Sequence, residues 1–439
     1  MYVYVKSKLV ISQLMAVSWV VFSIYAARPW IDDLTHLLNF PAALFIVAGI
    51  ALIPGWANAF LIAGLLLDRR PHYDPYRDLP PVTVLIAAYN EEKSIGETLE
   101  SVFQQRYRGN VEVIVIDDGS VDGTAEAAKK ATEGGSYRAN CRFKLLSMSV
   151  NSGKSRALNR GLEEAAHDLI VTIDADTYLH PESLARLISN IVDGPGNTAA
   201  VAGTVLVRNS RDNLLSRLQE WDYFLGIAVV KRIQSLYQGT LVAQGAFSVY
   251  RKAAIVEAGG WSDRVGEDIV LTWAFHSMGH RVGYAENAFA FTRVPETYRQ
   301  FFRQRRRWAR GLIEAFKCHP RVLVRPRMVS PFILFNFLFP YLDFVYLAIF
   351  IPGILAALFF QVYAIVGLMT LLLLPLMILV NITMFYHQRN VFRYHGLGIR
   401  KNVLGAVFYV LTYQMIISPA SFLGYISEFL NVKRSWGTK

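Results

Sequence analysis

The sequence contains little charge. Only 18% of its 439 residues are charged and 53% are hydrophobic, whereas about 25% of the residues of a typical soluble domain are charged. A membrane protein is therefore expected. Cysteine is scarce as well, because Cys141 and Cys318 are the only two. Two cysteines offer no zinc-binding spacing, and both fall in a region that we assign below to the cytoplasm, where a structural disulfide is not expected.

Two common nucleotide-binding signatures are missing. The first strand of the middle region is followed by Tyr89-Asn90-Glu91-Glu92 instead of a glycine-rich turn, which disfavours an NAD enzyme. Gly153-Lys154-Ser155 resembles the end of a phosphate loop, but the glycine required five positions earlier is Met148. A phosphate loop is therefore disfavoured too.

Long stretches at both ends of the chain lack charge. Leu9–Ala27 and Phe40–Leu67 contain no charged residue, and Met328–Tyr386 contains only Asp343. A bilayer core of about 30 Å needs roughly 20 apolar residues per helix. The first two stretches therefore predict one span each and the third predicts two, while Val403–Ser427 is a further apolar stretch.

The flanking charges predict the orientation. Lys6 and Lys8 precede the first span, Asp32 and Asp33 follow it, and Arg69 and Arg70 follow the second. By the positive-inside rule, the N-terminus and the middle region lie in the cytoplasm. A cleaved signal peptide over residues 1–27 is the rival interpretation, but no small-residue cleavage site precedes the second span. The net charge of +11 then reflects topology and lipid head groups, and no nucleic-acid partner is expected.

The chain is accordingly divided into three parts. Residues 1–70 hold two transmembrane helices, residues 71–327 form a cytoplasmic domain with interfacial helices, and residues 328–439 hold the C-terminal transmembrane helices and a basic tail. A single span over Val403–Ser427 would place the tail outside. A cytoplasmic tail, which its basic charge favours, requires a re-entrant hairpin broken at Pro419 or an additional earlier crossing.

Strands and helices alternate in the middle region. The predicted strands are Val82–Ala88, Val111–Asp117, Phe143–Met148, Leu169–Asp174 and Ala199–Val207. The predicted helices are Ser94–Gln105, Gly123–Glu133, Ser155–Ala166 and Pro181–Val192. This alternation indicates a mostly parallel α/β sheet covered on both faces, with ligands bound at the carboxyl ends of its strands.

Acidic residues follow two of these strands. Asp174 and Asp176 have the period-two spacing that lets both face one ligand, and such a pair suits Mg²⁺ or Mn²⁺. An ordinary turn aspartate is the alternative. The second strand ends in Asp117-Asp118-Gly119-Ser120, where a carboxylate can accept hydrogen bonds from a ribose or a base.

Two further segments carry candidate chemistry. Gly266-Glu267-Asp268 precedes the helical run Ile269–Met278, and Asp268 is a candidate general base; an N-cap carboxylate is the alternative. Between Arg299 and Arg310 lie six arginines and Trp308. They could bind a departing diphosphate and stack on a sugar ring, or form an interfacial amphipathic helix.

Taken in order, these motifs resemble the membrane-bound processive synthases of glycosyltransferase family 2, which make cellulose, chitin, hyaluronan or poly-N-acetylglucosamine. The resemblance covers roughly residues 80–320 and the flanking spans. It rests on Asp117-Asp118-Gly119-Ser120, Asp174-Ala175-Asp176, Gly266-Glu267-Asp268 and Gln304-Arg305-Arg306-Arg307-Trp308, the last matching the family's Q-x-x-R-W.

The resemblance implies a role for each matching residue. The implied catalytic residues are Asp268, as base, and Glu267 beside it. The implied donor-binding residues are Tyr89, Glu91, Asp118, Lys154 and Asp174. The implied metal ligands are Asp174 and Asp176. The implied acceptor- and diphosphate-binding residues are Gln304, Arg307, Trp308, Gln244 and Gly245.

The sequence departs from the family pattern in two places. Gln244-Gly245-Ala246 stands where many relatives carry Ser-Gly in the loop that touches the acceptor sugar, which leaves donor and linkage preference open. The tail Trp436-Gly437-Thr438-Lys439 is similar to a Trp-Gly-Thr-Arg segment of hyaluronan and chitin-type synthases, but ends in lysine.

The resemblance implies a Rossmann-like GT-A domain between N-terminal and C-terminal transmembrane helices in a bacterial inner or plasma membrane. It would polymerise a sugar, with N-acetylglucosamine favoured, from a UDP-sugar donor by inversion and pass the polysaccharide across the membrane. The expected partners are the donor, the growing polysaccharide and membrane lipids; a small accessory membrane subunit stays open. A non-processive enzyme adding one sugar to a lipid is the alternative. A silent export subunit is disfavoured by the intact set of carboxylates.

Overall fold

The computed structural model describes residues 4–69, 78–133, 140–367, 370, 373–399 and 401–432. Contacts divide the described residues into two units. The first, which we call the helical unit, comprises residues 4–69, 302–309 and 326–432 with the gaps given above. The second, which we call the sheet unit, comprises residues 78–301 and 310–325 with its gap at 134–139.

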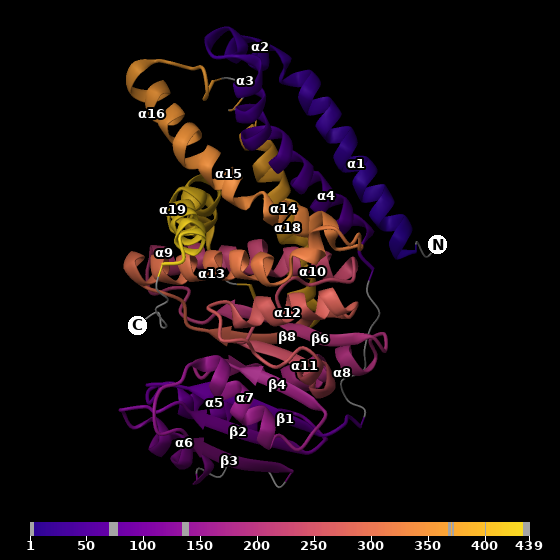
Figure 1. The fold of residues 1–439 in the computed structure, drawn as a ribbon, viewed down its shortest axis with the longest axis vertical. Helices are drawn as coiled ribbons and strands as arrows, with labels where there is room; N and C mark the ends of the chain where they lie inside the picture. The colour runs from indigo at the N-terminus through magenta and orange to yellow at the C-terminus, as the bar shows by residue number, and fades with distance from the viewer. Residues whose placement is uncertain are drawn as a thin grey trace. The chain divides into compact units, whose positions relative to one another are not determined.

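The sheet unit is built on one sheet of eight strands in the order β3-β2-β1-β4-β7-β6-β8-β5 (Figure 1). The strands are β1 (Val82–Ala88), β2 (Val111–Asp117), β3 (Cys141–Ser147), β4 (Leu169–Ile173), β5 (Thr177–Leu179), β6 (Thr198–Val207), β7 (Phe247–Arg251) and β8 (Arg281–Thr292). The pairs among β3, β2, β1 and β4 are parallel, as is β6 with β8. β7 runs antiparallel to both neighbours, and β5 runs antiparallel to β8.

Helices cover both faces of the sheet because its central strands are apolar on both sides. On β1, Val84 and Ile86 point into one core and Leu85 into the other, as the two-residue period of a strand requires. The first core is closed by α5 (Ile95–Phe103), α6 (Thr124–Glu133) and α8 (Ser183–Val192). The second is closed by α7 (Lys154–Glu164), α11 (Lys252–Glu257) and α12 (Glu267–Met278).

The remaining helical segments of this unit follow β6 and β8. They are α9 (Leu214–Trp221), a π-helical stretch Asp222–Ile227, α10 (Ala228–Leu236), and a 3₁₀ turn Pro320–Leu323. Helix α13 (Tyr298–Cys318) contributes residues to both units.

The five predicted strands are present, and β1 and β2 begin and end at the predicted residues. The expectation of a mostly parallel sheet is only half right, because three strands, β5, β7 and β8, were not predicted. β7 runs antiparallel to both of its neighbours, and β5 pairs antiparallel with β8 at the edge of the sheet. The parallel half carries the acidic strand ends, so the edge where ligands are expected is the predicted one.

The helical unit contains long apolar helices. Its helices are α1 (Val5–Ala26), α2 (Arg28–Leu37), α3 (Phe40–Val47), α4 (Ile53–Leu67), α14 (Ser330–Phe337), α15 (Phe339–Val345), α16 (Ile351–Phe360), α18 (Leu373–Tyr394) and α19 (Val403–Phe429). Short π-helical stretches, Ala48–Leu52 and Tyr346–Phe350, join α3 to α4 and α15 to α16.

By length and composition, four helices among the described residues can span a membrane. They are Val5–Ala26, Phe40–Leu67, Phe339–Phe360 and Val403–Phe429. The last is one continuous helix with Pro419 inside it, so the hairpin broken at Pro419 is wrong. The tail segment Trp436–Lys439 lies outside the described residues, and its side of the membrane stays a prediction.

Polar side chains hold two of these helices together. The Asp343 carboxylate on α15 accepts hydrogen bonds from Gln414 (3.1 Å), Ser418 (2.6 Å) and Tyr425 (3.1 Å) on α19. An ionised group in an apolar helix is costly unless it is bonded in this way. The one charged residue of Met328–Tyr386 is thus bonded to a neighbouring helix.

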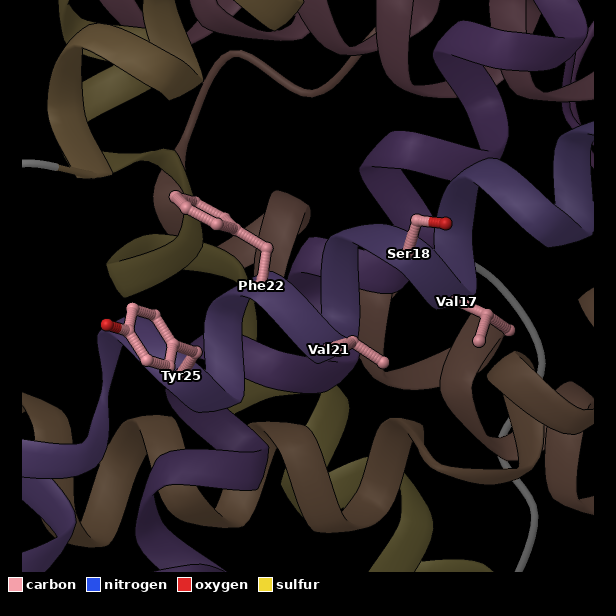
Figure 2. A pocket seen from close by; sticks show the side chains of 5 residues that line it. All are labelled: Val17, Ser18, Val21, Phe22 and Tyr25. Carbon is pink, nitrogen blue, oxygen red and sulfur yellow. The ribbon is translucent and has the colours of Figure 1, made fainter.

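A shallow groove lies on the surface of α1 (Figure 2). Its lining consists of Val17, Ser18, Val21, Phe22 and Tyr25. All five residues come from one apolar helix and none is an acid or an amine. This groove therefore lacks the carboxylates and the lysine that the expected chemistry needs.

Candidate active site

The turn after β2 is bonded to the loop before α7. The Asp118 carboxylate accepts hydrogen bonds from the backbone N–H groups of Ser152 and Gly153, both at 2.8 Å. Gly119 has φ of +69°, and a Cβ there would lie 2.7 Å from the backbone nitrogen of Asn151. Glycine is required at this position both by the left-handed backbone and by the close approach. Asp118, which is only 3% exposed, therefore fixes the Asn-Ser-Gly-Lys loop to the end of the sheet.

The turn after β1 adjoins the same acidic turn. Asn90 adopts φ of +55° and donates its backbone N–H to the Ser120 hydroxyl at 3.0 Å. The backbone N–H of Glu91 donates to the Thr124 hydroxyl at 2.8 Å. Tyr89 is 44% exposed at the end of β1. The structure thus brings the segment with Tyr89 and Glu91 beside the Asp118 turn.

Lys154 is the central cation of the site. Its Nζ lies 2.5 Å from Asp174 Oδ1 and 3.5 Å from Glu267 Oε1. Burial by itself lowers the pKa of Lys154, but Asp174, Glu267 and Asp268 outweigh it and hold that pKa above its usual range. The ammonium therefore stays protonated, and it joins the end of β4 to the beginning of α12.

Gly245 leaves room for this ammonium. A Cβ at Gly245 would lie 2.7 Å from Lys154 Nζ and 3.8 Å from Asp174 Oδ1. The Gly245 backbone N–H also points to Asp268 Oδ2 at 3.4 Å. The loop that departs from the family pattern therefore contacts three of the predicted site residues. Next to it, the Gln244 side chain donates to the backbone carbonyl of Gly203 at 2.7 Å.

Asp268 lies in the first turn of α12 and not at its N-cap. The N-cap residue is Gly266, and no side chain of the segment caps the helix there. Asp268 Oδ1 instead accepts from the N–H of Ile269 at 2.8 Å. The alternative in which Asp268 is only an N-cap carboxylate is therefore wrong.

The carboxylates at the end of β4 are suited to a cation. Burial, followed by the negative charges of Asp174 and Glu91, raises the pKa of Asp176 to about 6. A divalent cation would relieve this repulsion. Among the described residues, no group of three or more His, Cys, Asp or Glu side chains is placed to hold a metal ion. An Mg²⁺ or Mn²⁺ ion that takes one or two carboxylates and completes its shell with phosphate oxygens and water needs no larger cluster. The assignment of Asp174 and Asp176 as its ligands stays a prediction.

The Q-x-x-R-W residues Gln304, Arg307 and Trp308 lie on α13 in the helical unit. There the Arg305 guanidinium stacks over the Trp308 ring at 4.2 Å. Arg306 donates to the Ser427 hydroxyl of α19 at 3.0 Å. The segment is helical and packs on an apolar helix of its own unit, and its position at a membrane interface stays a prediction. Its role toward a diphosphate or an acceptor stays a prediction.

Two residues near Asp268 were not predicted. Burial lowers the pKa of Lys231, on α10, to about 7, and only the nearby Asp268 opposes that shift. Glu314, on α13, accepts a hydrogen bond from the backbone N–H of Gly266 at 3.0 Å. Neither stands in a motif. The one available signal for Lys231 is a pair of charged residues, Lys231 and Arg232, inside the otherwise apolar segment 224–233, and Glu314 had none.

Comparison with known proteins identifies the domain. The family described as Glycosyl transferase family 2 matches residues 83–259. Two relatives are described as poly-beta-1,6-N-acetyl-D-glucosamine synthase. The one from Staphylococcus aureus is 34% identical over 246 residues, 56% of this chain and 57% of that protein. The one from Staphylococcus epidermidis is 32% identical over 282 residues, 63% of this chain and 65% of that protein. The chain thus spans less than two thirds of the length of either relative.

A solved structure supports the fold. The mannosyltransferase PcManGT from Pyrobaculum calidifontis, in complex with GDP-Man and Mn²⁺, matches with a TM-score of 0.59 at 18% identity, covering 88% of this chain and 98% of that one. The GT-A-like α/β fold predicted from the sequence is confirmed, and the glycosyltransferase family 2 match covers residues 83–259. Residues 83–259 of this chain are therefore a glycosyltransferase family 2 domain.

Proposed function

We propose that the chain is a membrane-embedded, divalent-metal-dependent inverting glycosyltransferase that polymerises N-acetylglucosamine from UDP-N-acetylglucosamine. The observation that carries the proposal is the ion cluster of Lys154, Asp174 and Glu267 beside Asp268 at the open end of the sheet. The choice of sugar and the processive mode are supported by the two relatives named as poly-N-acetylglucosamine synthases.

The site residues then have distinct tasks. Asp118 holds the loop that carries Lys154. Together with Tyr89 and Glu91, Asp118 also borders the uridine of the donor. Asp174 and Asp176 would hold the metal ion, and that ion would neutralise negative charge on the leaving diphosphate. Lys154 is placed to take up diphosphate charge as well, since it already bridges two carboxylates of the site.

Asp268 is the proposed general base. Its carboxylate accepts the proton of the acceptor hydroxyl while that oxygen attacks the anomeric carbon, and the bond to the diphosphate breaks on the opposite side. The product is a β-linked sugar and UDP. Gln304, Arg307 and Trp308, with Gln244 and Gly245, are proposed to bind the diphosphate and the acceptor, because a retained polymer needs a platform for stacking its sugars.

The four apolar helices support a membrane location. The positive-inside pattern supports a cytoplasmic site, from which the polymer would cross the membrane. Membrane lipids are then direct neighbours of the protein. A small accessory membrane subunit is compatible with the proposal and is not required by it.

The test is a transfer assay on purified protein in detergent. UDP-glucose, UDP-N-acetylglucosamine and UDP-galactose are supplied in turn with Mg²⁺ or Mn²⁺, and the product is sized and digested with linkage-specific hydrolases. We expect a polymer from UDP-N-acetylglucosamine alone. A single sugar on a lipid acceptor would replace the proposal with the non-processive alternative. Neither transfer nor donor hydrolysis with any UDP-sugar would overturn both.

A further inference from the structure

The first turn of α12 is held from outside the helix. Helix N-termini leave backbone N–H groups without intrahelical partners, and a side chain of the local segment usually accepts from them. In α12 the N-cap residue is Gly266, which has no side chain to do so, and the one local acceptor is Asp268, whose Oδ1 accepts from the N–H of Ile269. The N–H of Gly266 instead donates to Glu314 Oε2 at 3.0 Å, across 48 positions of sequence. The carboxylate comes from α13 and is only 1% exposed.

The same point is a contact between two backbones. A Cβ at Gly266 would lie 2.5 Å from the Cα of Gly311, and a Cβ at Gly311 would lie 2.9 Å from the Cα of Gly266. Real Cβ atoms do not approach backbone so closely, so both positions require glycine for this packing. One turn of α13 is therefore pressed against the residue that precedes Glu267 and Asp268.

A third contact lies two turns further along α12. Trp273, which is fully buried, meets Phe316 edge to face with ring centroids 4.6 Å apart. Gly311, Glu314 and Phe316 thus hold α12 along one short stretch of α13. The hydrogen bond to Glu314 is the contact nearest to Asp268 and the only directional one of the three.

We propose that Glu314 is a positioning residue for the transfer reaction: by fixing the N–H of Gly266 it sets where Asp268 presents its carboxylate. Glu314 does not touch a substrate in this arrangement. It acts through the backbone of residues 266–268. The inference rests on the proposed function in assigning Asp268 as base, and it adds a residue that lies outside every motif of the site.

The experiment compares three variants of the full-length protein in detergent. Glu314→Ala removes the acceptor, whereas Glu314→Gln keeps an oxygen that can accept from Gly266. Gly311→Ala leaves Glu314 intact and pushes the two backbones apart. Glu182→Ala is the matched control, because Glu182 is the residue at the N-cap of α8 and pairs with Arg186, in the same unit.

Positioning predicts a specific kinetic pattern. In Glu314→Ala, kcat falls roughly 10- to 100-fold, the loss typical of a misplaced catalytic group, while the KM for the donor stays within about twofold because the donor residues are untouched. Glu314→Gln recovers most of kcat, and Gly311→Ala loses kcat as Glu314→Ala does. Glu182→Ala lowers the melting temperature and leaves kcat per folded molecule unchanged.

Hydrogen–deuterium exchange over residues 263–270 measures how firmly Glu314 holds the Gly266 N–H, and it does not depend on turnover. We expect faster exchange there in Glu314→Ala and near-wild-type exchange in Glu314→Gln. Wild-type kcat in folded Glu314→Ala, or a loss that Glu314→Gln does not recover, overturns the positioning role. If the wild-type protein transfers no sugar while exchange over residues 263–270 still changes in the Glu314 variants, the proposed function fails but the structural role of Glu314 holds.

Discussion

Replacement of Lys154 by methionine tests the electrostatics of the site most simply. Methionine keeps the length and apolar stem of lysine and removes the charge between Asp174 and Glu267. Removing one partner of a buried ion pair costs about 3–5 kcal/mol, whereas an exposed pair contributes about 0–1 kcal/mol. The side chains of Lys154, Asp174 and Glu267 are 19%, 33% and 9% exposed. This intermediate burial gives an expected loss of about 2–4 kcal/mol in the free energy of unfolding.

The assay is thermal unfolding of the purified protein in metal-free buffer. For a domain of this size, about 1 kcal/mol corresponds to about 2–4 °C, so Lys154→Met should melt roughly 4–16 °C below wild type. Mn²⁺ should raise the melting temperature more in the variant than in wild type, because the ion can take over neutralisation of Asp174. Lys144→Met is the control, since Lys144 forms a partly exposed ion pair with Glu164 and should cost less than about 1 kcal/mol. Equal melting of Lys154→Met and wild type would refute the reasoning.

Three further outcomes are expected. Asp268→Asn should lower transfer by about 10²–10⁴-fold, the usual contribution of a general base, while calorimetry finds donor affinity within about twofold of wild type. Gly245→Ala should displace the Lys154 ammonium, because its Cβ would lie 2.7 Å from Nζ, and should lower kcat/KM about tenfold in the same transfer assay. Lys231 has a pKa lowered to about 7 by burial, so the unfolded chain binds more protons than the folded one between pH 7 and about 10. The free energy of unfolding should therefore rise with pH over that window by up to about 1 kcal/mol per unit, and denaturant titrations of Lys231→Met should lack this rise.

The parallel half of the sheet could be predicted because local pattern and burial agree there. β1 and β2 are short apolar runs bounded by polar turns, and they are buried on both faces. β8 escaped prediction because its interior contains Gly283, Glu286 and Asn287, which weaken the apolar pattern. Glu286 is accommodated by an ion pair with Arg232 at 3.0 Å. A contact of this kind arises only after the chain has folded.

The acidic residues of the site were predictable for a geometric reason. β2, β1 and β4 run parallel, so their carboxyl ends share one edge of the sheet, and Asp118 and Asp174 lie at that edge with β1 between their strands. The bridging role of Lys154 was not predictable, since it depends on Glu267 arriving from a helix more than a hundred residues later. Glu314 could not be predicted either, because it contacts the segment before Asp268 through the backbone N–H of Gly266, and a backbone contact leaves no pattern in the sequence.

The most direct test of the central claim, that the strand-end carboxylates bind a divalent ion together with a nucleoside diphosphate, is UDP binding measured by calorimetry with and without Mn²⁺. In wild type, Mn²⁺ should tighten UDP binding at least about tenfold, and in Asp176→Asn that gain should disappear, since one of the two proposed protein ligands is lost. UDP binding that ignores Mn²⁺ in the wild-type protein, or an undiminished Mn²⁺ effect in Asp176→Asn, would contradict the claim.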